Sequence, residues 1–385
     1  MTLVGALGRT ARASVDARGA LQILGTRWSL DWWIGADDRW RIPAEEVALR
    51  QELVEEMPVV RTSLRVPHGD AIQRVFGAGD GSIVLEVEND SPAPFALALV
   101  VSAAHVVSVE GETVVVDGAP AFTTERPSLR WATAVGSSVR DVVVAGDARD
   151  GPFAATRDRR GRVEAAFLHP VAHRATLRVV LAPTAHGERD VVDHADVVRG
   201  WQRQLARGMR VELPDPALDA AITRTRAQMM LAAGIASDAD ILAVLEDWGL
   251  DEEARLAWER ASIRHRRRAR RRALVRARET GREPWPSLPA SDADLLVRVR
   301  DLLVREDGDT VDVVRVLPES WRGANLEVRD APLRRGALSY ALRWHGPKPA
   351  LLWDAPEGLT LRAPGLDGAW STTEPSGEAL LGGRT

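Results

Sequence analysis

The most unusual grouping of side chains lies near the start of the chain, where four indoles alternate with carboxylates and arginines. Indole rings stack on the apolar faces of a pyranose, while carboxylates and arginines satisfy its hydroxyl groups. This combination predicts a carbohydrate-binding site. The side chains concerned are Trp28, Asp31, Trp32, Trp33, Asp37, Asp38 and Trp40, with Arg27 and Arg39 among them.

A structural interpretation of the same segment competes with the ligand site. Alternate residues of a β-strand face the same side of a sheet, so Trp28 and Trp32 would lie in a core. Asp37 and Asp38 would then lie in a turn after Gly35. We favour this interpretation, although 13 tryptophans against a single tyrosine keep the sugar-binding hypothesis open.

An arginine-rich run is the strongest electrostatic feature of the chain. On a helix, such a run can hold the phosphates of a polyanion, with a steep dependence on salt. An acidic segment just upstream and the near absence of lysine, typical of a GC-rich genome that we expect to be actinobacterial, favour a solvated or internally paired helix instead. We therefore do not expect nucleic acid as a partner. The run comprises Arg264, Arg266, Arg267, Arg268, Arg270, Arg271 and Arg272, and continues to Arg276 and Arg278.

Carboxylates in the middle of the chain are candidates for a catalytic pair. Glycoside hydrolysis needs two carboxylates, about 5 Å or about 6.5 to 9.5 Å apart, on either side of the scissile bond. Because the available acids surround a predicted helix end at residues 248–249, surface and capping roles explain them better, and we assign no catalytic residue. They are Glu246, Asp247, Asp251, Glu252, Glu253 and Glu259.

Metal and cofactor sites are not predicted. His169 and His173 are four residues apart, but no third ligand has metal-binding spacing. The chain also lacks a phosphate-binding glycine loop, a dinucleotide fingerprint and a serine nucleophile elbow. Cysteine is absent, which excludes disulfides and thiolate chemistry. We expect no cofactor and no metal.

The elements that position these residues begin with short strands separated by turn residues, for example at 82–88, 95–101, 113–117, 139–145 and 176–181. Many short strands at such spacing predict an antiparallel β-sandwich over residues 1–196. One stretch is left open: Pro43 followed by acids opens either a short helix through Val54 or an extended strand.

Helical patterns follow over residues 197–308. Asp215 is a candidate N-cap for a helix at 217–233. Two similar segments at 237–242 and 291–296 each open an amphipathic helix, and Asp251 is a candidate cap of the second helix of an αα-hairpin. Strand patterns return over residues 309–385 and predict a small C-terminal antiparallel β domain. The fold class is therefore α+β multidomain.

The end of the helical region resembles the exit from a helical barrel into the C-terminal β domain of six-hairpin glycosidases. The similar segments are residues 302–306 (LLVRE), 317–323 (LPESWRG), 325–328 (NLEV), 334–346 (RRGALSYALRWHG) and 350–353 (ALLW). The superfamily includes glucoamylase-like, glycogen-debranching-like and rhamnosidase-like enzymes. The resemblance implies an N-terminal sandwich followed by an (α/α)6 barrel that carries the catalytic acids.

The chain departs from this superfamily in its helical region. About 90 residues hold four or five helices, not the twelve of a complete barrel. We therefore expect a degenerate, non-catalytic relative that acts in carbohydrate recognition or scaffolding. The alternatives are an active glycoside hydrolase on α-glucan-type substrates and a polyanion- or protein-binding module that uses the arginine run.

The remaining composition bears on location and partners. The net charge of −4 over 385 residues gives no bulk attraction to polyanions. The N-terminus lacks the layout of an export signal, and no apolar run approaches the roughly 20 residues that span a bilayer. We expect a cytoplasmic protein without a membrane span. A reduced helical layer leaves an apolar face, so a protein partner or a homo-oligomer is a further expectation.

Overall fold

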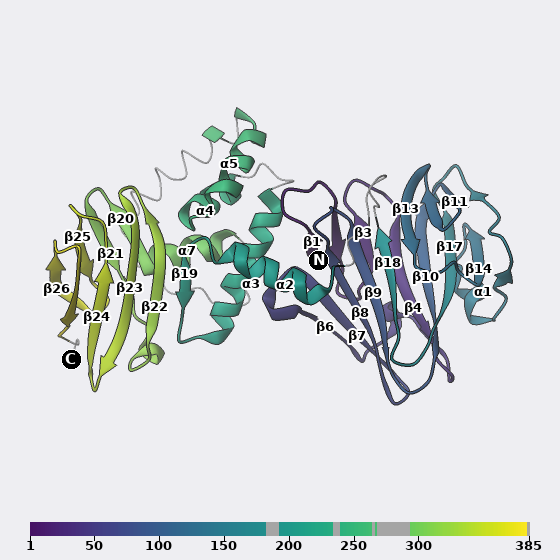
Figure 1. Cartoon of the computed structure of the whole chain (residues 1–385), viewed down its shortest axis with the longest axis horizontal. Coiled ribbons are helices and arrows are strands. Elements are labelled where there is room, and N and C mark those ends of the chain that lie inside the picture. The colour runs from purple at the N-terminus through teal and green to yellow at the C-terminus, as the bar shows by residue number, and fades with distance from the viewer. Residues whose placement is uncertain (182–191, 234–238, 264–265, 268–292, 383–385) are drawn as a thin grey trace. The chain divides into compact units, whose positions relative to one another are not determined.

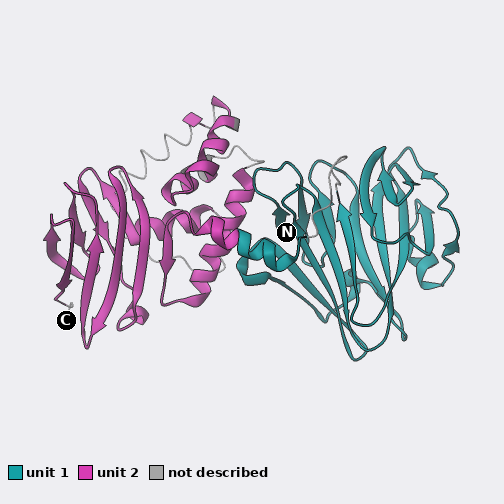
Figure 2. Cartoon of the chain, viewed as in Figure 1, with its two compact units in different colours: residues 1–200 teal, residues 201–385 magenta. Residues whose placement is uncertain are grey.

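The computed structural model describes residues 1–181, 192–233, 239–263, 266–267 and 293–382. The chain divides into two compact units, Met1–Gly200 and Trp201–Thr385 (Figure 2). Most of the described strands pair antiparallel, and helices are few, which confirms the predicted α+β multidomain class. Helix α2 (His194–Leu205) contains the boundary between the units.

The first unit is built from two antiparallel sheets (Figure 1). Strand alternation gives each sheet one apolar face, and the two apolar faces share one core. The first sheet runs β1 (Thr2–Gly5), β2 (Arg12–Val15), β3 (Leu21–Ile23), β4 (Ser29–Gly35), β10 (Phe95–Ala104), β17 (Val163–Val171), β14 (Arg130–Val135) and β15 (Arg149–Asp150), with β5 (Trp40–Arg41) on β4. The second runs β16 (Thr156–Arg157), β11 (Val106–Glu110), β12 (Thr113–Val116), β13 (Ala119–Thr124), β18 (Thr176–Leu181), β9 (Ile83–Asp90), β8 (Gly69–Gly77), β7 (Val59–Val66) and β6 (Leu49–Leu53).

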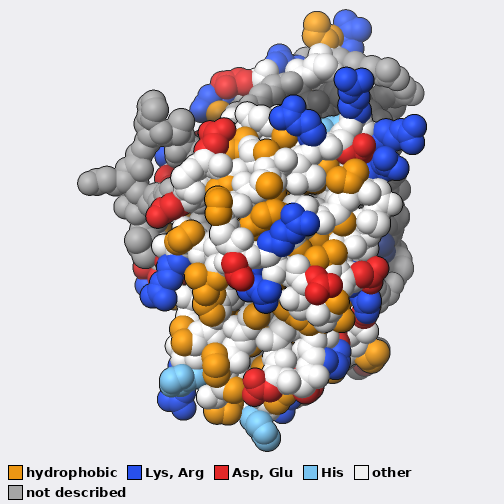
Figure 3. Space-filling model, turned by 90° about the vertical axis from the view of Figure 1, so that its right-hand side faces the viewer, with side chains coloured by type: hydrophobic (Ala, Val, Ile, Leu, Met, Phe, Trp, Pro, Cys, Tyr) orange, Lys and Arg blue, Asp and Glu red, His pale blue; other side chains and the backbone are white. Residues whose placement is uncertain are grey.

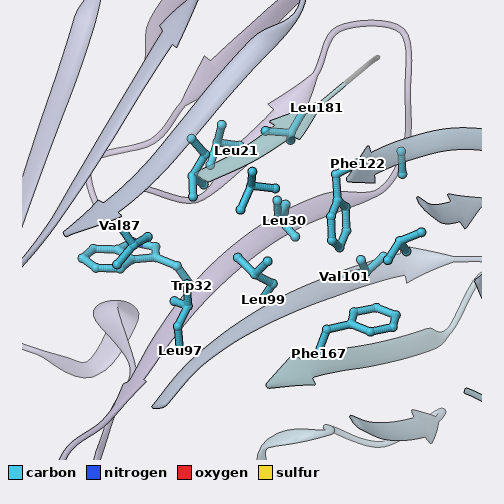
Figure 4. Close-up of a cluster of buried hydrophobic side chains, with 14 of the residues drawn as sticks. Leu21, Leu30, Trp32, Val87, Leu97, Leu99, Val101, Phe122, Phe167 and Leu181 are labelled. Atoms are coloured by element: carbon cyan, nitrogen blue, oxygen red, sulfur yellow. The ribbon is translucent and has the colours of Figure 1, made fainter. Parts of the chain in front are cut away.

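Large aliphatic and aromatic side chains fill the space between the sheets. Figure 4 shows Trp32 of β4 beside Val87 and Leu97, and Phe122 of β13 near Phe167 of β17. Each of these five side chains is almost completely buried. Burial of this apolar surface is the main favourable contribution to folding of the sandwich.

A smaller cluster covers the outer face of the first sheet. Val139 and Val143, four residues apart, pack there with Trp33 and Ile42. Val143 belongs to α1 (Arg140–Val144) and Val139 is the N-cap residue of that helix, so the predicted strand at residues 139–145 is wrong. A run of valines favours a strand locally, but the spacing of four residues lets a single helical turn bury two of them on the sheet.

The stretch that begins at Pro43, for which the sequence left two alternatives, forms three elements. Pro43–Glu45 form the short 3-10 helix η1, with proline at its start. The chain then extends into β6, and a second short 3-10 helix, η2 (Val54–Glu56), follows it. The extended alternative is therefore correct for most of this segment.

The second unit places helices and sheets around one core. The described helices are α3 (Pro216–Ala233), α4 (Ala239–Asp247), α5 (Asp251–Arg260), α7 (Ala293–Leu303) and η3 (Glu319–Trp321). One sheet runs β19 (Arg210–Glu212), β22 (Leu326–Leu333), β23 (Gly336–His345), β24 (Lys348–Asp354) and β27 (Ser376–Leu380). The other runs β20 (Val304–Asp307), β21 (Thr310–Val313), β25 (Thr360–Ala363) and β26 (Asp367–Thr372). All these pairs are antiparallel except β21 with β25, which is parallel.

The first residues of α3 and α5 show whether Asp215 and Asp251 are N-caps, as the sequence predicts. The Asp215 carboxylate accepts hydrogen bonds from the backbone N–H groups of Ala217 and Leu218, at 3.0 and 3.1 Å, so the predicted N-cap is confirmed. Asp251, in contrast, is the first residue of α5, and the N-cap position belongs to Leu250. Three residues, Trp248, Gly249 and Leu250, connect α4 to α5, with Gly249 at positive φ, as the αα-hairpin prediction requires.

Candidate functional site

Strand β17 positions the residues at the centre of the candidate site. Phe167 and His169 are two apart, so both point from β17 towards the space between the two sheets. In the register of the first sheet, Phe167 pairs with Leu99 of β10 and with Trp131 of β14. His169 pairs with Leu97 of β10. An imidazole therefore lies in a row of core side chains.

A pocket of about 330 Å³ opens beside these residues. Its walls come from both sheets of the sandwich and from the loops next to them. The lining residues are Val109, Gly111, Glu112, Val114, Phe122, Thr124, Pro127, Ser128, Trp131, Gly151, Pro152, Phe153, Phe167 and His169. The volume is at the lower end of the range for small-molecule sites, about 300 to 1,000 Å³.

Four aromatic rings form a continuous series along the pocket. Phe122 meets Phe167 edge to face, with ring centroids 5.9 Å apart. Phe153 lies 5.0 Å from Phe167 and 5.0 Å from Trp131. Phe153 is half-buried and the other three rings are buried. Such edge-to-face and tilted pairs are favourable contacts that stabilise the arrangement of the four rings.

Two hydrogen bonds hold the loops at the mouth of the pocket. The indole N–H of Trp131 donates to the carbonyl of Gly151 at 3.1 Å, which fixes the loop that carries Phe153. The hydroxyl of Thr124 donates to the carbonyl of Arg126 at 2.7 Å. Because both groups are satisfied within the protein, the pocket keeps its form through its own contacts.

Among the residues that line the pocket, only His169 has buried side-chain polar atoms without a hydrogen-bond partner. Its side chain is 3 % exposed, and neither ring nitrogen has a hydrogen-bond partner within the part of the chain that the structure describes. Burial lowers the pKa of His169 from 6.5 to about 4. The imidazole is therefore neutral at pH 7, with one donor nitrogen and one acceptor nitrogen.

The face of the molecule near this end of the sandwich mixes side-chain types. Figure 3 looks from the side where β11, β14 and α1 lie in Figure 1, and shows hydrophobic and charged side chains interspersed. Exposed apolar residues on these elements include Val109 and Val135. The mixture gives no large field of one sign on this face.

The tryptophans of the sequence-predicted carbohydrate site lie in two separate places. Trp28 and Trp32 belong to the core between the sheets, whereas Trp33 belongs to the cluster beneath α1 on the opposite face. These three side chains are 5 %, 0 % and 6 % exposed. Trp40 packs against the Trp33 cluster. The indoles of Trp28, Trp32 and Trp33 are therefore covered by protein, and Trp40 is half-buried. The structural interpretation, which placed Trp28 and Trp32 in a core, is confirmed.

Two carboxylates of this segment, Asp31 and Asp38, bind side chains of the same segment. Asp31 accepts the indole N–H of Trp33 at 2.9 Å, and burial raises the pKa of Asp31. Asp38 pairs with both terminal nitrogens of Arg41 at 2.7 Å, which lowers the pKa of Asp38 to about 2. Asp37 is exposed in the turn after Gly35. None of these carboxylates lines the pocket.

The arginine run falls mostly outside the described residues, namely at Arg264, Arg268, Arg270, Arg271 and Arg272. Arg266 and Arg267 are described. The guanidinium of Arg266 donates to the carbonyls of Ala261 and Glu259, at 3.0 and 3.3 Å. Polyanion binding by the run stays a prediction.

The acids weighed for catalysis lie on α4 and α5. Glu252 and Glu253 both pair with Arg207, Glu259 pairs with Arg255, and Glu246 accepts the indole N–H of Trp258. The surface roles inferred from the sequence fit Glu246, Glu252 and Glu259, whereas Glu253 is buried. Within the described ranges, no group of three or more histidine and carboxylate side chains could hold a metal ion. In the same ranges, no helix has the length and apolar character to cross a membrane.

Sequence reasoning missed the pocket itself. It noted His169 only as half of a histidine pair, and His173 is in fact exposed beyond the end of β17. The available signal was the Phe-x-His spacing within an otherwise apolar strand, which places an imidazole on the core face. No protein-family model matches the chain, and no curated protein matches it.

Proposed function

We propose that the protein is a non-catalytic recognition protein whose N-terminal sandwich binds a small organic ligand in the pocket lined by His169. The observation that carries the proposal is a buried imidazole without a hydrogen-bond partner in the described structure, on the wall of an aromatic pocket. Ligand pockets typically combine apolar walls with a few polar groups that fix the ligand's orientation.

The carboxylate content of the pocket supports recognition over hydrolysis. Glu112 is the one carboxylate among the lining residues, all of which the structure describes, and it is exposed at the mouth. Glycoside hydrolysis generally needs two carboxylates on either side of the bond that breaks. Carbohydrate stays the ligand class that the resemblance to six-hairpin glycosidases implies, and sugars therefore belong in the first ligand panel.

Methyl NMR of valine-labelled protein tests the proposal. Val109 and Val114 line the pocket, whereas Val47 is 97 % exposed and does not. Titration with monosaccharides, aryl glycosides and small phenols is expected to shift the methyl signals of Val109 and Val114 and leave those of Val47 unchanged. If no member of the panel shifts the two pocket valines, the proposal fails. Hydrolysis of an aryl glycoside that Glu112→Gln abolishes would also overturn it.

A further inference from the structure

We propose that the free edge of β27 in the C-terminal unit binds an extended segment of another protein, which adds a strand to the sheet and carries a basic residue near an apolar one. This inference is independent of the pocket in the N-terminal unit. Three features of the edge support it: its outward backbone groups, its lack of protection and the side chains beside it.

The backbone of β27 alternates between the neighbouring strand and the outside of the sheet. β27 ends the order of its sheet and pairs with β24. Leu381 donates its N–H to the carbonyl of Pro349 at 2.9 Å, and Ala355 donates its N–H to the carbonyl of Pro375 at 2.7 Å. Because these directions alternate along an antiparallel strand, the odd-numbered residues of β27 face β24 and the even-numbered residues face outward.

The outward backbone groups form a row along the edge. They are the N–H and C=O groups of Ser376, Glu378 and Leu380. Within the described residues, none of these groups has a hydrogen-bond partner. Natural sheets usually block such edges with proline, lysine or a bulge. β27 contains no proline or lysine, and its ladder with β24 shows no register shift, so the edge is a template for a further strand.

The other edge strands of the two C-terminal sheets are less suited to this role. β19 has three residues and β20 has four, which offers a ligand few backbone partners. The ladder of β26 with β25 is interrupted by a bulge, which bends a strand out of line. β27 is therefore the edge that best fits an extended ligand.

Side chains beside the edge select the chemistry of the ligand. Glu378 and Leu380 lie on the outer face of the sheet, since the alternate residues face the core. Leu380 is 57 % exposed, and Leu352, opposite Glu378 on β24, is 36 % exposed. Neither Glu378 nor the exposed Asp354 has an ion-pair partner within the described part of the chain. A basic residue opposite Glu378 and an apolar residue opposite Leu380 make favourable cross-strand pairs.

The test uses the capped hexapeptide TVTRTT and its variant TVTETT. When the first pairs antiparallel with β27, its valine lies opposite Leu380 and its arginine opposite Glu378. Methyl NMR of the leucine-labelled full chain at pH 7 is expected to show shifts at Leu352 and Leu380 and none at Leu129, which is 63 % exposed in the N-terminal unit. TVTRTT should bind more tightly than TVTETT by about fivefold or more, because like charges directly opposite one another repel.

N-methylated peptides test the backbone pairing separately from the charge. Methylation of the arginine nitrogen removes the N–H that pairs with the carbonyl of Glu378, and should weaken binding by about tenfold or more. Methylation of the next threonine changes an N–H that faces away from β27, and should change the dissociation constant by less than about twofold. Equal effects of the two methylations would show that no strand is added.

Substitutions in the protein test the same contacts from the other side. Glu378→Arg should reverse the preference, so that TVTETT binds more tightly, whereas Glu125→Arg, at an exposed position of the N-terminal unit, should leave it unchanged. Glu378→Pro removes an outward N–H that β24 does not use, and should abolish binding. If the proline variant fails to fold, Glu378→Arg decides.

Three results would overturn the inference. One is the absence of methyl shifts at Leu352 and Leu380 with millimolar TVTRTT. Another is equal affinity of wild-type protein for the two peptides. The third is self-association of the wild-type protein that Glu378→Pro removes, because the edge would then pair with a second copy of this chain. None of these results bears on ligand binding in the pocket, which the valine signals report.

Discussion

Phe153 lies on Trp131 with ring centroids 5.0 Å apart and an angle of 63° between the ring planes. Trp131 belongs to β14, whereas Phe153 follows β15 in a segment without regular structure. The contact fixes a loop side chain on a strand side chain, and the hydrogen bond from Trp131 to Gly151 holds the same loop. The form of the pocket therefore depends on a residue outside the sheets.

Phe153→Ala should destabilise the N-terminal unit and open the pocket. Loss of one half-buried ring with two aromatic neighbours is expected to lower the free energy of unfolding by about 2 kcal/mol. Urea unfolding monitored by circular dichroism measures the change. Leu129→Ala is the control, because Leu129 is 63 % exposed and should cost less than about 0.5 kcal/mol. Equal effects of the two substitutions would contradict the role assigned to Phe153.

His169 should make the sandwich sensitive to acid. Its pKa is about 4 in the folded protein against 6.5 without burial, so the unfolded chain binds the proton more readily. Stability therefore falls as the pH drops from 6.5 to about 4, by roughly 3 kcal/mol in total. In His169→Leu this loss is absent, and the difference in unfolding free energy between variant and wild type should grow between pH 7 and pH 4. A difference that does not change with pH would contradict the lowered pKa.

The tight turn at Gly19 packs closely against the buried side chains of Trp32 and Gln73. Gly19 has φ of +87°, and a Cβ atom there would lie 2.4 Å from Gln73 Oε1 and 2.6 Å from Trp32 Nε1. Gly19→Ala is therefore expected to lower stability by about 3 kcal/mol or more. Gly25→Ala is the matched control, since Gly25 also has positive φ but no atom within 4 Å of the added Cβ. It should cost about 1 kcal/mol, and thermal or urea unfolding compares the two.

Much of the first unit could be predicted from local pattern. Alternation and turn residues indicated its strands, and the same alternation placed Trp28 and Trp32 in the core. Local pattern failed at residues 139–145, because there the outer face of the sheet selects a helical turn that buries Val139 and Val143. Tertiary packing overrides the β-propensity of valine at that place.

The pocket could not be predicted in the same way. Its walls come from strands and loops between residues 109 and 169, and their meeting depends on the order of strands in two sheets. Nothing local marks Phe153 as a partner of Trp131, since 22 residues separate them. His169 has a local signal in its alternation with Phe167, but its lack of a partner is a property of the packed structure.

Asp219 in the second unit should oppose folding at neutral pH. Burial, together with the negative charges of Glu212 and Asp215, raises the pKa of Asp219 from 3.8 to about 6, although Arg226 acts in the opposite direction. The folded state thus binds the proton more tightly, so stability falls as the pH rises from 3.8 to about 6 and stays reduced above it.

Asp219→Asn removes this cost, because the amide has the shape of the carboxyl group without its charge. After discounting for partial exposure, we expect a gain of about 1 kcal/mol at pH 7, or about 2 to 4 °C in the melting temperature of the C-terminal unit. The gain should disappear below about pH 4. Asp215→Asn is the control: it keeps a capping side chain at the start of α3 and should change stability by less than about 0.5 kcal/mol. Loss of stability in Asp219→Asn at pH 7 would show instead that the attraction between Asp219 and the buried Arg226 outweighs the burial of the carboxylate.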